Sequence, residues 1–119
     1  RGRGKIINIA SGTAYKGQRH LAAYVTSKAA VVGMTKALAR DLGAEKINVN
    51  SIAPGFTESA SVNDNPHQKA NTDATVKSRA LQRTQVPDDL VGALVFLASP
   101  ASDFVTGQTI AVDGGSIML

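Results

Sequence analysis

Three short apolar runs mark the predicted strands of this chain. The first, KIINIAS at residues 5–11, is rich in β-branched residues and stops at Gly12, as expected for a buried strand. A second run, INVNSIAPG at residues 47–55, ends in a proline and a glycine, which do not continue a strand. The third run, at residues 109–112, lies just before a glycine pair. Each run therefore predicts one strand that is followed by a turn.

A long helix is predicted between the first two strands. Residues 22–42 contain no proline and many alanines, and Gly43 follows as a candidate C-cap. One set of apolar residues recurs at helical spacing and a second set lies on another side, so we expect burial on more than one face. The first set is Val31, Met34, Leu38 and Leu42, and the second is Val25, Ala29 and Val32.

The remaining segments comprise one further helix and two polar stretches. Residues 87–98 begin with a proline and two aspartates and carry leucines on one face, which predicts a helix. Residues 12–21 contain two glycines and mixed polarity, and they predict a loop. Residues 57–85 are polar with weak periodicity, which is typical of either a mobile surface loop or a lid over a functional site.

The order strand, helix, strand predicts a βαβ unit with parallel strands and a right-handed crossover. Ligands of open parallel sheets gather outside the carboxyl ends of the strands. Ser11 ends the first predicted strand, Pro54 and Gly55 end the second, and Asp113 ends the third. We therefore expect the candidate functional residues to lie at one edge of the sheet.

Composition narrows the classes of protein that fit the chain. The 119 residues suit one domain, 43% of them are hydrophobic, and no apolar run approaches the ~18–20 residues of a membrane span. The absence of cysteine excludes disulfides, thiolate catalysis and cysteine-bound metal, and it is compatible with a reducing cytoplasm. We expect a cytoplasmic protein with no membrane association and no metal site.

The net charge of +4 and the basic cluster RGRGK at residues 1–5 raise the possibility of nucleic-acid binding. No aromatic residue lies between these cations to stack on a base, and the other basic residues are mixed with acidic ones. A solvated turn before a strand is the favoured interpretation. Because the chain begins at Arg1 rather than Met and has no leader, we also expect it to be a piece of a longer protein.

Both tyrosines of the chain precede a cation by four residues. Tyr24 and Lys28 fall in the predicted long helix, where positions four apart share a face. Tyr15 and Arg19 fall in a predicted loop with a glycine between them, so their geometry is not fixed. A nearby cation favours the phenolate form of tyrosine and can make it a usable acid or base. Alone, however, this spacing is common on helices by chance.

The surrounding segments resemble the short-chain dehydrogenase/reductase family over essentially the whole chain. Ser11 precedes Tyr24 by thirteen positions, and Pro54 follows Tyr24 by thirty. The segments SKAAVVGMTKALARDLG, INVNSIAPGF and VFLASPASDFVTGQTIAVDGG each look like family segments and stand in the family's order. The resemblance implies an α/β fold in which residues 1–119 are the C-terminal half of one doubly wound, Rossmann-like parallel-sheet domain.

The resemblance also implies a catalytic role for three residues. Tyr24 matches the general acid that protonates a carbonyl oxygen during hydride transfer, or the base in the reverse direction. Lys28 matches the residue that makes this tyrosine more acidic and binds the nicotinamide ribose. Ser11 matches the hydroxyl that hydrogen-bonds the substrate oxygen, and it acts as an electrostatic stabiliser rather than as a nucleophile.

Further residues match the family's cofactor and substrate contacts. Pro54 and Gly55 match the turn that approaches the nicotinamide, and the hydroxyls of Thr57 and Ser59 match groups that reach the carboxamide or the phosphates. Ser59 stands where threonine is more usual, which weakens that match. Thr13 and Tyr15 follow Ser11 closely enough to line a substrate pocket together with it, although surface display fits them equally well.

Two elements of the family are absent from the chain, namely the glycine-rich turn that cradles the pyrophosphate and an upstream asparagine of the proton relay. Both would precede Arg1, as would the residue that selects NAD or NADP, so the choice between these two cofactors is not readable. We expect the isolated chain to be inactive and to bind NAD(P)H negligibly.

The sequence thus predicts an oxidoreductase that transfers hydride between NAD(H) or NADP(H) and a small-molecule secondary alcohol or ketone. A homo-oligomer, specifically a tetramer, is expected from the resemblance and from the two apolar faces of the long helix. A 3-oxoacyl-(acyl-carrier-protein) reductase is one specific alternative. A sugar-nucleotide epimerase or dehydratase and a non-catalytic cofactor-sensing or scaffold protein remain as rivals from other classes.

Overall fold

The computed structural model describes residues 2–58 and 66–119 and contains a parallel sheet of three strands. The strands are β1 (Gly4–Ile9), β2 (Ile47–Pro54) and β3 (Thr109–Val112), and they lie in the order β1-β2-β3. Gly4 pairs with Ile47 in the first ladder, and Ser51 pairs with Thr109 in the second. All three predicted strands and their parallel arrangement are confirmed.

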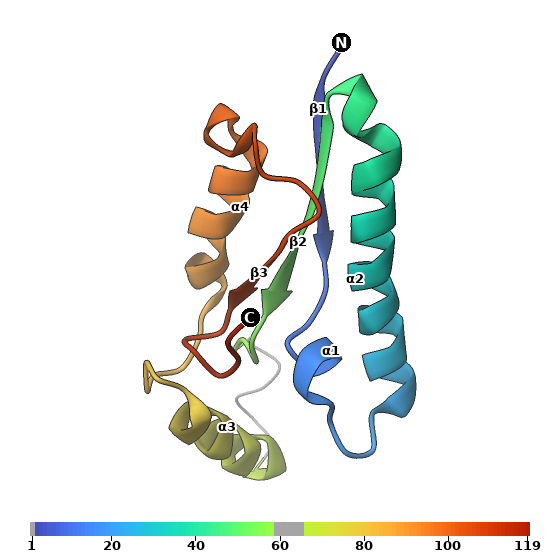
Figure 1. Cartoon of the computed structure of the whole chain (residues 1–119). Helices are drawn as coiled ribbons and strands as arrows, with labels where there is room; N and C mark the ends of the chain where they lie inside the picture. Colours follow the sequence, from blue (N-terminus) through green and yellow to red (C-terminus); the bar gives the residue numbers. More distant parts are fainter. Residues whose placement is uncertain (1, 59–65) are drawn as a thin grey trace.

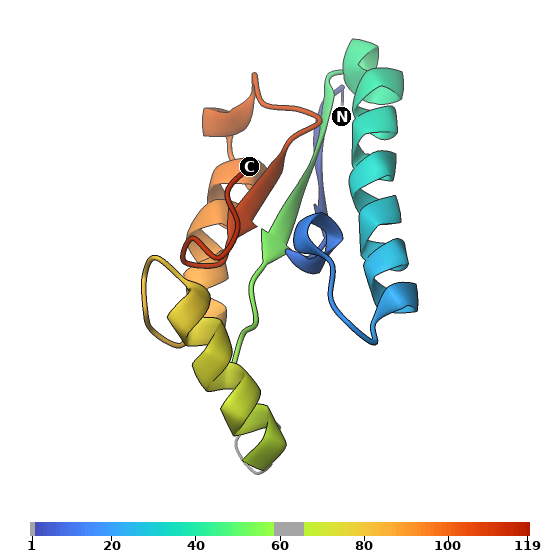
Figure 2. The same cartoon turned by 60° about the horizontal axis from the view of Figure 1, so that its bottom comes forward.

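The sheet is covered on both faces by helices. Helix α2 (Ala22–Leu42) packs on one face, and helix α4 (Val91–Ala98) packs on the other (Figure 1). Figure 2 shows the same three layers from a second direction, with β2 in the middle of the sheet. The bounds predicted for the long helix are confirmed, and the predicted helix at residues 87–98 is present as a 3₁₀ turn at Pro87–Leu90 followed by α4.

The end of α2 differs from the expectation. Gly43 has a right-handed φ of −60° and begins a 3₁₀ turn, Gly43–Glu45, rather than capping the helix in a left-handed conformation. The left-handed residue is Lys46, with a φ of 60°. The chain therefore reverses toward β2 three residues later than predicted.

One face of α2 is buried in the described chain. Val32, Thr35 and Ala39 are buried against the sheet, whereas Met34 is 47% exposed and does not share their face. Thr35 occupies an apolar position because its hydroxyl donates to the carbonyl of Val31 at 2.8 Å and accepts from Nδ2 of Asn8 at 3.0 Å. Met34 lies on the other predicted apolar face, which does not pack on the sheet, and its burial by a partner stays a prediction.

The centre of the molecule is β2. Val49, Ile52 and Ala53 are fully or almost fully buried, as is the polar Asn50. Asn50 satisfies its amide by donating to the carbonyl of Val105 at 2.8 Å and by accepting from the main-chain N–H of Gln108 at 3.0 Å. These bonds hold the segment before β3 against β2, because a buried amide is costly unless both of its ends are paired.

Two segments predicted as loops contain helices. Residues 13–16 form α1 (Thr13–Lys16), a single turn that ends at Gly17 with a φ of 72°. The polar stretch at 57–85 contains α3 (Pro66–Ser78), in which no side chain between Asn71 and Ser78 is buried. A helix that does not pack on a core needs no apolar stripe, so periodicity gave no signal for α3.

The described chain is less compact than a complete domain of its length. Its Cα radius of gyration is 15.5 Å, against about 13.5 Å for a compact domain of this size. Strand β1 pairs only with β2 among the described residues and leaves Ile6 and Ile9 exposed. Large apolar side chains of α4 are exposed as well, namely Val91, Leu94, Val95 and Phe96.

Candidate active site

The carboxyl ends of all three strands point toward the end of the molecule that carries α1 and α3 (Figures 1 and 2). Ser11 follows β1, Gly55 follows β2, and Asp113 follows β3. The strand ends are joined by main-chain bonds, from the N–H of Gly12 to the carbonyl of Pro54 at 3.3 Å and from the N–H of Gly55 to the carbonyl of Val112 at 2.9 Å. The structure thus brings the predicted strand-end residues together.

Ser11 lies at the base of this site and is 8% exposed. Its Oγ accepts two hydrogen bonds from Thr13, one from the main-chain N–H at 3.3 Å and one from the hydroxyl at 3.0 Å. A serine hydroxyl has two acceptor sites and one donor proton. No described residue accepts that proton, so the Ser11 hydroxyl has a donor that is not used within the described chain.

Tyr24 and Lys28 lie one turn apart in the first turns of α2. The Nζ of Lys28 lies 5.8 Å from the centre of the Tyr24 ring and donates to the main-chain carbonyl of Ile9 at 3.1 Å. Because Ile9 is the last residue of β1, this bond places the ammonium beside the strand end that carries Ser11. Tyr24 is 44% exposed, so its ring is accessible at the edge of the site.

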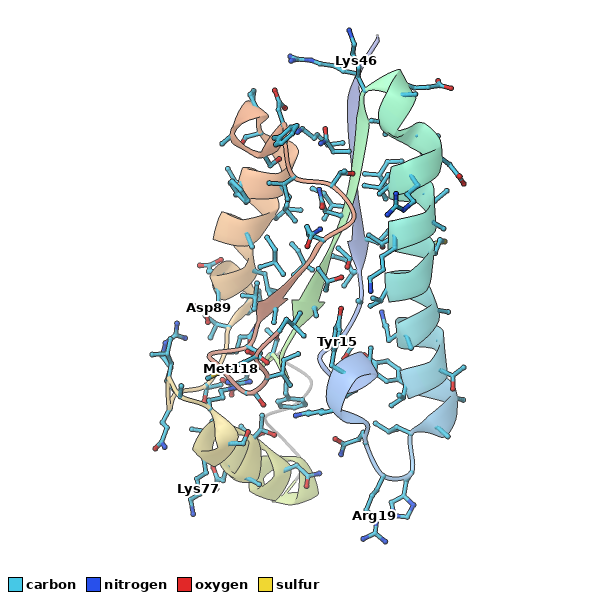
Figure 3. The ribbon with its side chains drawn as sticks, viewed as in Figure 1. Tyr15, Arg19, Lys46, Lys77, Asp89 and Met118 are labelled. Atoms are coloured by element: carbon cyan, nitrogen blue, oxygen red, sulfur yellow. The ribbon has the colours of Figure 1, made fainter. Side chains whose placement is uncertain are left out.

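Tyr15 and Arg19 do not form an equivalent pair. Helix α1 ends at Lys16, and Gly17 directs the chain away before Arg19, so the two residues do not share a helix face. Figure 3 shows Tyr15 near the carboxyl end of the sheet and Arg19 at the tip of the loop beyond α1. Tyr15 is 41% exposed. Of the two tyrosine–cation pairs, only Tyr24 and Lys28 have a fixed spacing.

The turn after β2 is packed too closely for a side chain at Gly55. A Cβ at Gly55 would lie 2.7 Å from both the Cβ of Asp113 and the Oε1 of Gln85, so only glycine fits there. Thr57 donates its hydroxyl proton to the carbonyl of Gly55 at 3.0 Å and thereby bends the turn on itself. Ser59, also predicted as a cofactor contact, lies outside the described residues.

Asp113 organises the chain after β3. Its carboxylate is 3% exposed and accepts three main-chain N–H bonds, from Gly115 at 2.9 Å, Ser116 at 3.2 Å and Ile117 at 2.9 Å. These bonds wrap the C-terminal segment across the site, where the Oγ of Ser116 accepts from the Nζ of Lys16 at 3.4 Å. Asp113 therefore shapes the C-terminal turn.

Two buried polar residues of the site were missed by the sequence reasoning. Arg79 and Gln85 are each 4% exposed. Both line a small cavity of about 210 Å³ behind the turn after β2, together with Asp113 and Gly114. They fall in a polar stretch in which arginine and glutamine normally face solvent, so no local pattern distinguishes them.

The Arg83–Asp89 ion pair closes the outer side of this cavity. The two nitrogens of Arg83 lie 2.6 and 2.8 Å from the carboxylate of Asp89. The hydrogen bond from Arg83, with a further one from the N–H of Val86, holds the pKa of Asp89 well below its usual range. Because the lowered pKa belongs to the folded state, the pair is present at neutral pH and is lost only in strong acid.

Other features of the described chain lie away from this chemistry. A larger hollow of about 940 Å³ lies at the opposite end of the sheet, beside Gly4, Lys5 and Ile47. Within residues 2–58 and 66–119 no group of three or more acidic or histidine side chains is arranged to hold a metal ion. In the same residues, no helix is both long enough and apolar enough to cross a membrane.

Comparison with known proteins gives a consistent result. Residues 1–116 match the family model described as enoyl-(acyl carrier protein) reductase. The chain is 43% identical over 117 residues to the 2-dehydro-3-deoxy-D-gluconate 5-dehydrogenase of Escherichia coli K12, covering 94% of this chain and 44% of that protein. It is 40% identical over 116 residues to a 3-oxoacyl-[acyl-carrier-protein] reductase of Rickettsia felis, covering 98% of this chain and 47% of that protein.

Solved structures have the same fold. A gluconate 5-dehydrogenase from Burkholderia cenocepacia, in complex with NADP and tartrate, superposes with a TM-score of 0.89 at 40% identity, over 98% of this chain and 46% of that one. The chain thus spans about half the length of the relatives that it matches. The family model matches almost all residues of the chain, and the relatives are dehydrogenases and reductases. The chain therefore belongs to the short-chain dehydrogenase/reductase family.

Proposed function

We propose that residues 1–119 form the proton-transfer half of an oxidoreductase that moves hydride between a nicotinamide cofactor and a secondary alcohol or ketone. The observation that carries the proposal is the position of Lys28. Its ammonium binds the carbonyl of Ile9 at 3.1 Å and lies 5.8 Å from the ring of Tyr24. One cation therefore links the end of β1, where Ser11 lies, to an accessible phenol.

The three side chains have complementary chemistry for reducing a ketone. Ser11 donates its free proton to the substrate oxygen and orients it. Tyr24 transfers its hydroxyl proton to the same oxygen as a hydride arrives at the carbonyl carbon, so that the alcohol forms. Lys28 stabilises the phenolate that remains on Tyr24. In the oxidative direction the phenolate of Tyr24 takes the proton from the alcohol oxygen as hydride leaves the carbon, while Ser11 keeps its own proton and only hydrogen-bonds that oxygen.

A bound NAD or NADP supplies or accepts the hydride, and the residues after β2 fit such a group. The missing side chain at Gly55 lets the turn pack directly on Asp113 and Gln85, which fixes its main chain at the strand end where the nicotinamide is proposed to bind. The ammonium of Lys28 binds one carbonyl and has two further protons, so it is available to the nicotinamide ribose. Pro54 and Thr57 are proposed as contacts of the nicotinamide. Ser59 is proposed as a further contact. Bound NADP in a related gluconate 5-dehydrogenase supports this assignment.

We propose that a dinucleotide-binding half precedes these residues in the full-length protein, meaning this chain together with that half. Three observations support it: the unpaired edge of β1, the exposed apolar residues of β1 and α4, and the length of the relatives. A glycine-rich turn and a helix N-terminus in that half would anchor the pyrophosphate. As a family member with this site, the protein is proposed to act in the cytoplasm.

A substrate that carries a carboxylate is favoured over the other candidates. Lys16 of α1 reaches Ser116, and Ser116 in turn lies 3.3 Å from Ser78 at the end of α3. Among the described residues the ion pairs join Lys5 to Asp103 and Arg83 to Asp89, so Lys16 has no carboxylate of its own. The side chains of Lys16, Ser78 and Ser116, which come from α1, α3 and the C-terminal segment, thus lie together one helical turn beyond Thr13. They offer hydrogen-bond donors to an anionic end of a substrate.

The names of the relatives agree with either of two substrates. The 2-dehydro-3-deoxy-D-gluconate 5-dehydrogenases of several bacteria act on a sugar acid, which has a free carboxylate. A 3-oxoacyl-(acyl-carrier-protein) substrate, the alternative, is a thioester without one. Lys16 favours the sugar acid. A non-catalytic scaffold is a further alternative, which intact Ser11, Tyr24 and Lys28 disfavour.

The first prediction compares the two tyrosines in the full-length protein. Tyr24→Phe removes the proton donor, so kcat should fall by about 10²- to 10⁴-fold. Tyr15→Phe should change mainly KM or nothing, because Tyr15 has no cation at a fixed distance. Steady-state kinetics with a panel of sugar acids and alcohols measures both variants. Equal losses would show that Tyr24 has no special role, and an inactive parent protein would favour the scaffold.

The second prediction concerns the cation beside Tyr24. Lys28→Met should weaken cofactor binding and should move the pH–rate profile to higher pH, because the phenolate loses its nearby positive charge. Lys36→Met, on the exposed side of the same helix, is the matched control and should leave the profile in place. If Lys28→Met also leaves the profile unchanged, the ammonium does not act on Tyr24.

The third prediction tests the substrate class through Lys16. Lys16→Met should raise KM for gluconate about tenfold, the effect of losing one favourable ionic contact of ~1.4 kcal/mol. The KM for glucitol, which has the same carbon chain without the carboxylate, should not change. Lys77→Met removes another cation at the same end of the molecule (Figure 3) and is the control. A similar rise for both substrates would refute the carboxylate contact.

The fourth prediction is the assembly state of the full-length protein. We propose a symmetric homo-oligomer, specifically a tetramer, with α2 at one interface, because the outer face of α2 exposes Met34 among small residues such as Ala30 and Gly33. Light scattering at micromolar concentration should give the mass of a tetramer. A monomer under these conditions would show that this face needs no partner.

A further inference from the structure

Arg79 is a buried cation without an ionic partner among the described residues. It follows the last residue of α3 and is 4% exposed. The ion pairs of the described residues join Arg83 to Asp89 and Lys5 to Asp103, and neither includes Arg79. Buried arginines are normally paired with a carboxylate, since removing a lone charge from water is costly. Arg79 makes no salt bridge, and its charge acts on Asp89 only at longer range, where it helps to lower the pKa of that carboxyl.

The guanidinium of Arg79 binds two main-chain carbonyls instead. Nη2 donates to the carbonyl of Phe56 at 2.7 Å, and Nη1 donates to the carbonyl of Arg83 at 2.8 Å. Phe56 stands directly after Gly55, in the turn that we propose to face the nicotinamide. The ring of Phe56 is exposed, so packing of its own side chain does not fix its main chain.

The other contacts of the turn hold it from a different side. The N–H of Gly55 binds the carbonyl of Val112, and the N–H of Glu58 binds the carbonyl of Gln85 at 2.8 Å. Gln85 is itself fixed by a bond from its Nε2 to the carbonyl of Val112 at 2.8 Å. Among these groups, Arg79 alone connects the turn to the end of α3.

The C-terminal end of α3 connects the helix to the rest of the described chain. Figures 1 and 2 show it apart from the strands and joined to the body of the molecule at its C-terminal end. Its last residue, Ser78, reaches Ser116 of the C-terminal segment, and Arg79 continues from it with an N–H bond to the carbonyl of Val76 at 3.1 Å. A shift of α3 therefore moves Arg79 directly.

We propose that Arg79 is a positioning residue that fixes the main chain of the Gly55–Thr57 turn and couples it to α3. Substrate bound beside Ser78 and Ser116 restricts the motion of the end of α3. Through the hydrogen bond from Arg79, the main chain at Phe56 is then held in place as well. Nicotinamide and substrate thus reach their reacting distance together. The proposal rests on the proposed function, because it assigns the turn to the cofactor.

Arg79→Lys in the full-length protein is the first test. Lysine keeps the charge but offers a single ammonium, which cannot hold both carbonyls in the planar geometry of a guanidinium. We expect kcat to fall at least tenfold and the primary isotope effect from deuterated NAD(P)H to rise, since misplaced reactants slow the hydride step. Arg83→Lys, four residues on and exposed, is the matched control and should change neither quantity.

Hydrogen exchange gives a readout that does not need activity. In Arg79→Lys the amides of residues 55–58 should exchange at least several-fold faster, and gluconate should no longer slow them. In the parent protein and in Arg83→Lys, gluconate should slow them. If Arg79→Lys does not fold, Arg79→Gln, which keeps one amide donor, takes its place in both measurements.

Chemical rescue separates positioning from a general loss of structure. Arg79→Ala enlarges the cavity of about 210 Å³ that Arg79 lines, and millimolar guanidinium should bind there and restore part of kcat. Each of three results would overturn the proposal. The first is a loss of kcat that is explained by the fraction of unfolded protein alone, the second is an unchanged hydrogen-exchange rate at residues 55–58, and the third is the absence of rescue by guanidinium. Failure of the proposed function is distinguishable, because the parent protein would then show no turnover at all.

Discussion

The hydrogen bond from Lys28 to the carbonyl of Ile9 is the contact on which the candidate site depends. It joins the beginning of α2 to the end of β1, so the register of a helix on a sheet decides where Tyr24 lies relative to Ser11. In an isolated helix the same spacing of tyrosine and lysine would be an exposed pair of little consequence. Here the strand end supplies a fixed acceptor, and the ammonium is held at the end of β1 near the ring of Tyr24.

A second constraint lies at the ends of β2 and β3, where main chain packs on main chain. Gly55 has no room for a Cβ beside Asp113, and Asp113 uses its carboxylate to fold the C-terminal segment over the site. Arg79 and Gln85 support the same turn from behind. The turn after β2, which is proposed to face the nicotinamide, is thus a stretch of main chain that buried polar side chains hold in place.

Sequence patterns predicted the strands and α2 because burial on a sheet imposes a strong periodicity. The same reasoning overlooked Thr35 on the buried face, since a threonine with both of its hydroxyl bonds satisfied can replace an apolar residue. It also missed α3, whose described side chains need no apolar stripe. Patterns report burial against a core, and they fail where a helix lies on the surface.

For the site, the sequence predicted which residues meet at the sheet edge, because parallel strands place their carboxyl ends together. Ser11 could be named in this way, and Tyr24 and Lys28 from their spacing on the predicted helix. Their catalytic roles came from the family resemblance and stay a proposal. Arg79 and Gln85 could not be found, because their burial depends on contacts with Phe56 and Val112, which are 23 and 27 positions away. Long-range polar contacts of this kind leave no local signal.

The central claim is that residues 1–119 supply proton transfer while the preceding half supplies cofactor affinity. Calorimetric titration with NADH and NADPH tests it most directly. The full-length protein and residues 1–119 alone are titrated side by side, with Lys28→Met as a control in the full-length protein. We expect micromolar affinity of one cofactor for the full-length protein and no measurable heat with residues 1–119, which lack the phosphate anchor. Micromolar binding by residues 1–119 alone would contradict the assignment of cofactor affinity to the preceding half.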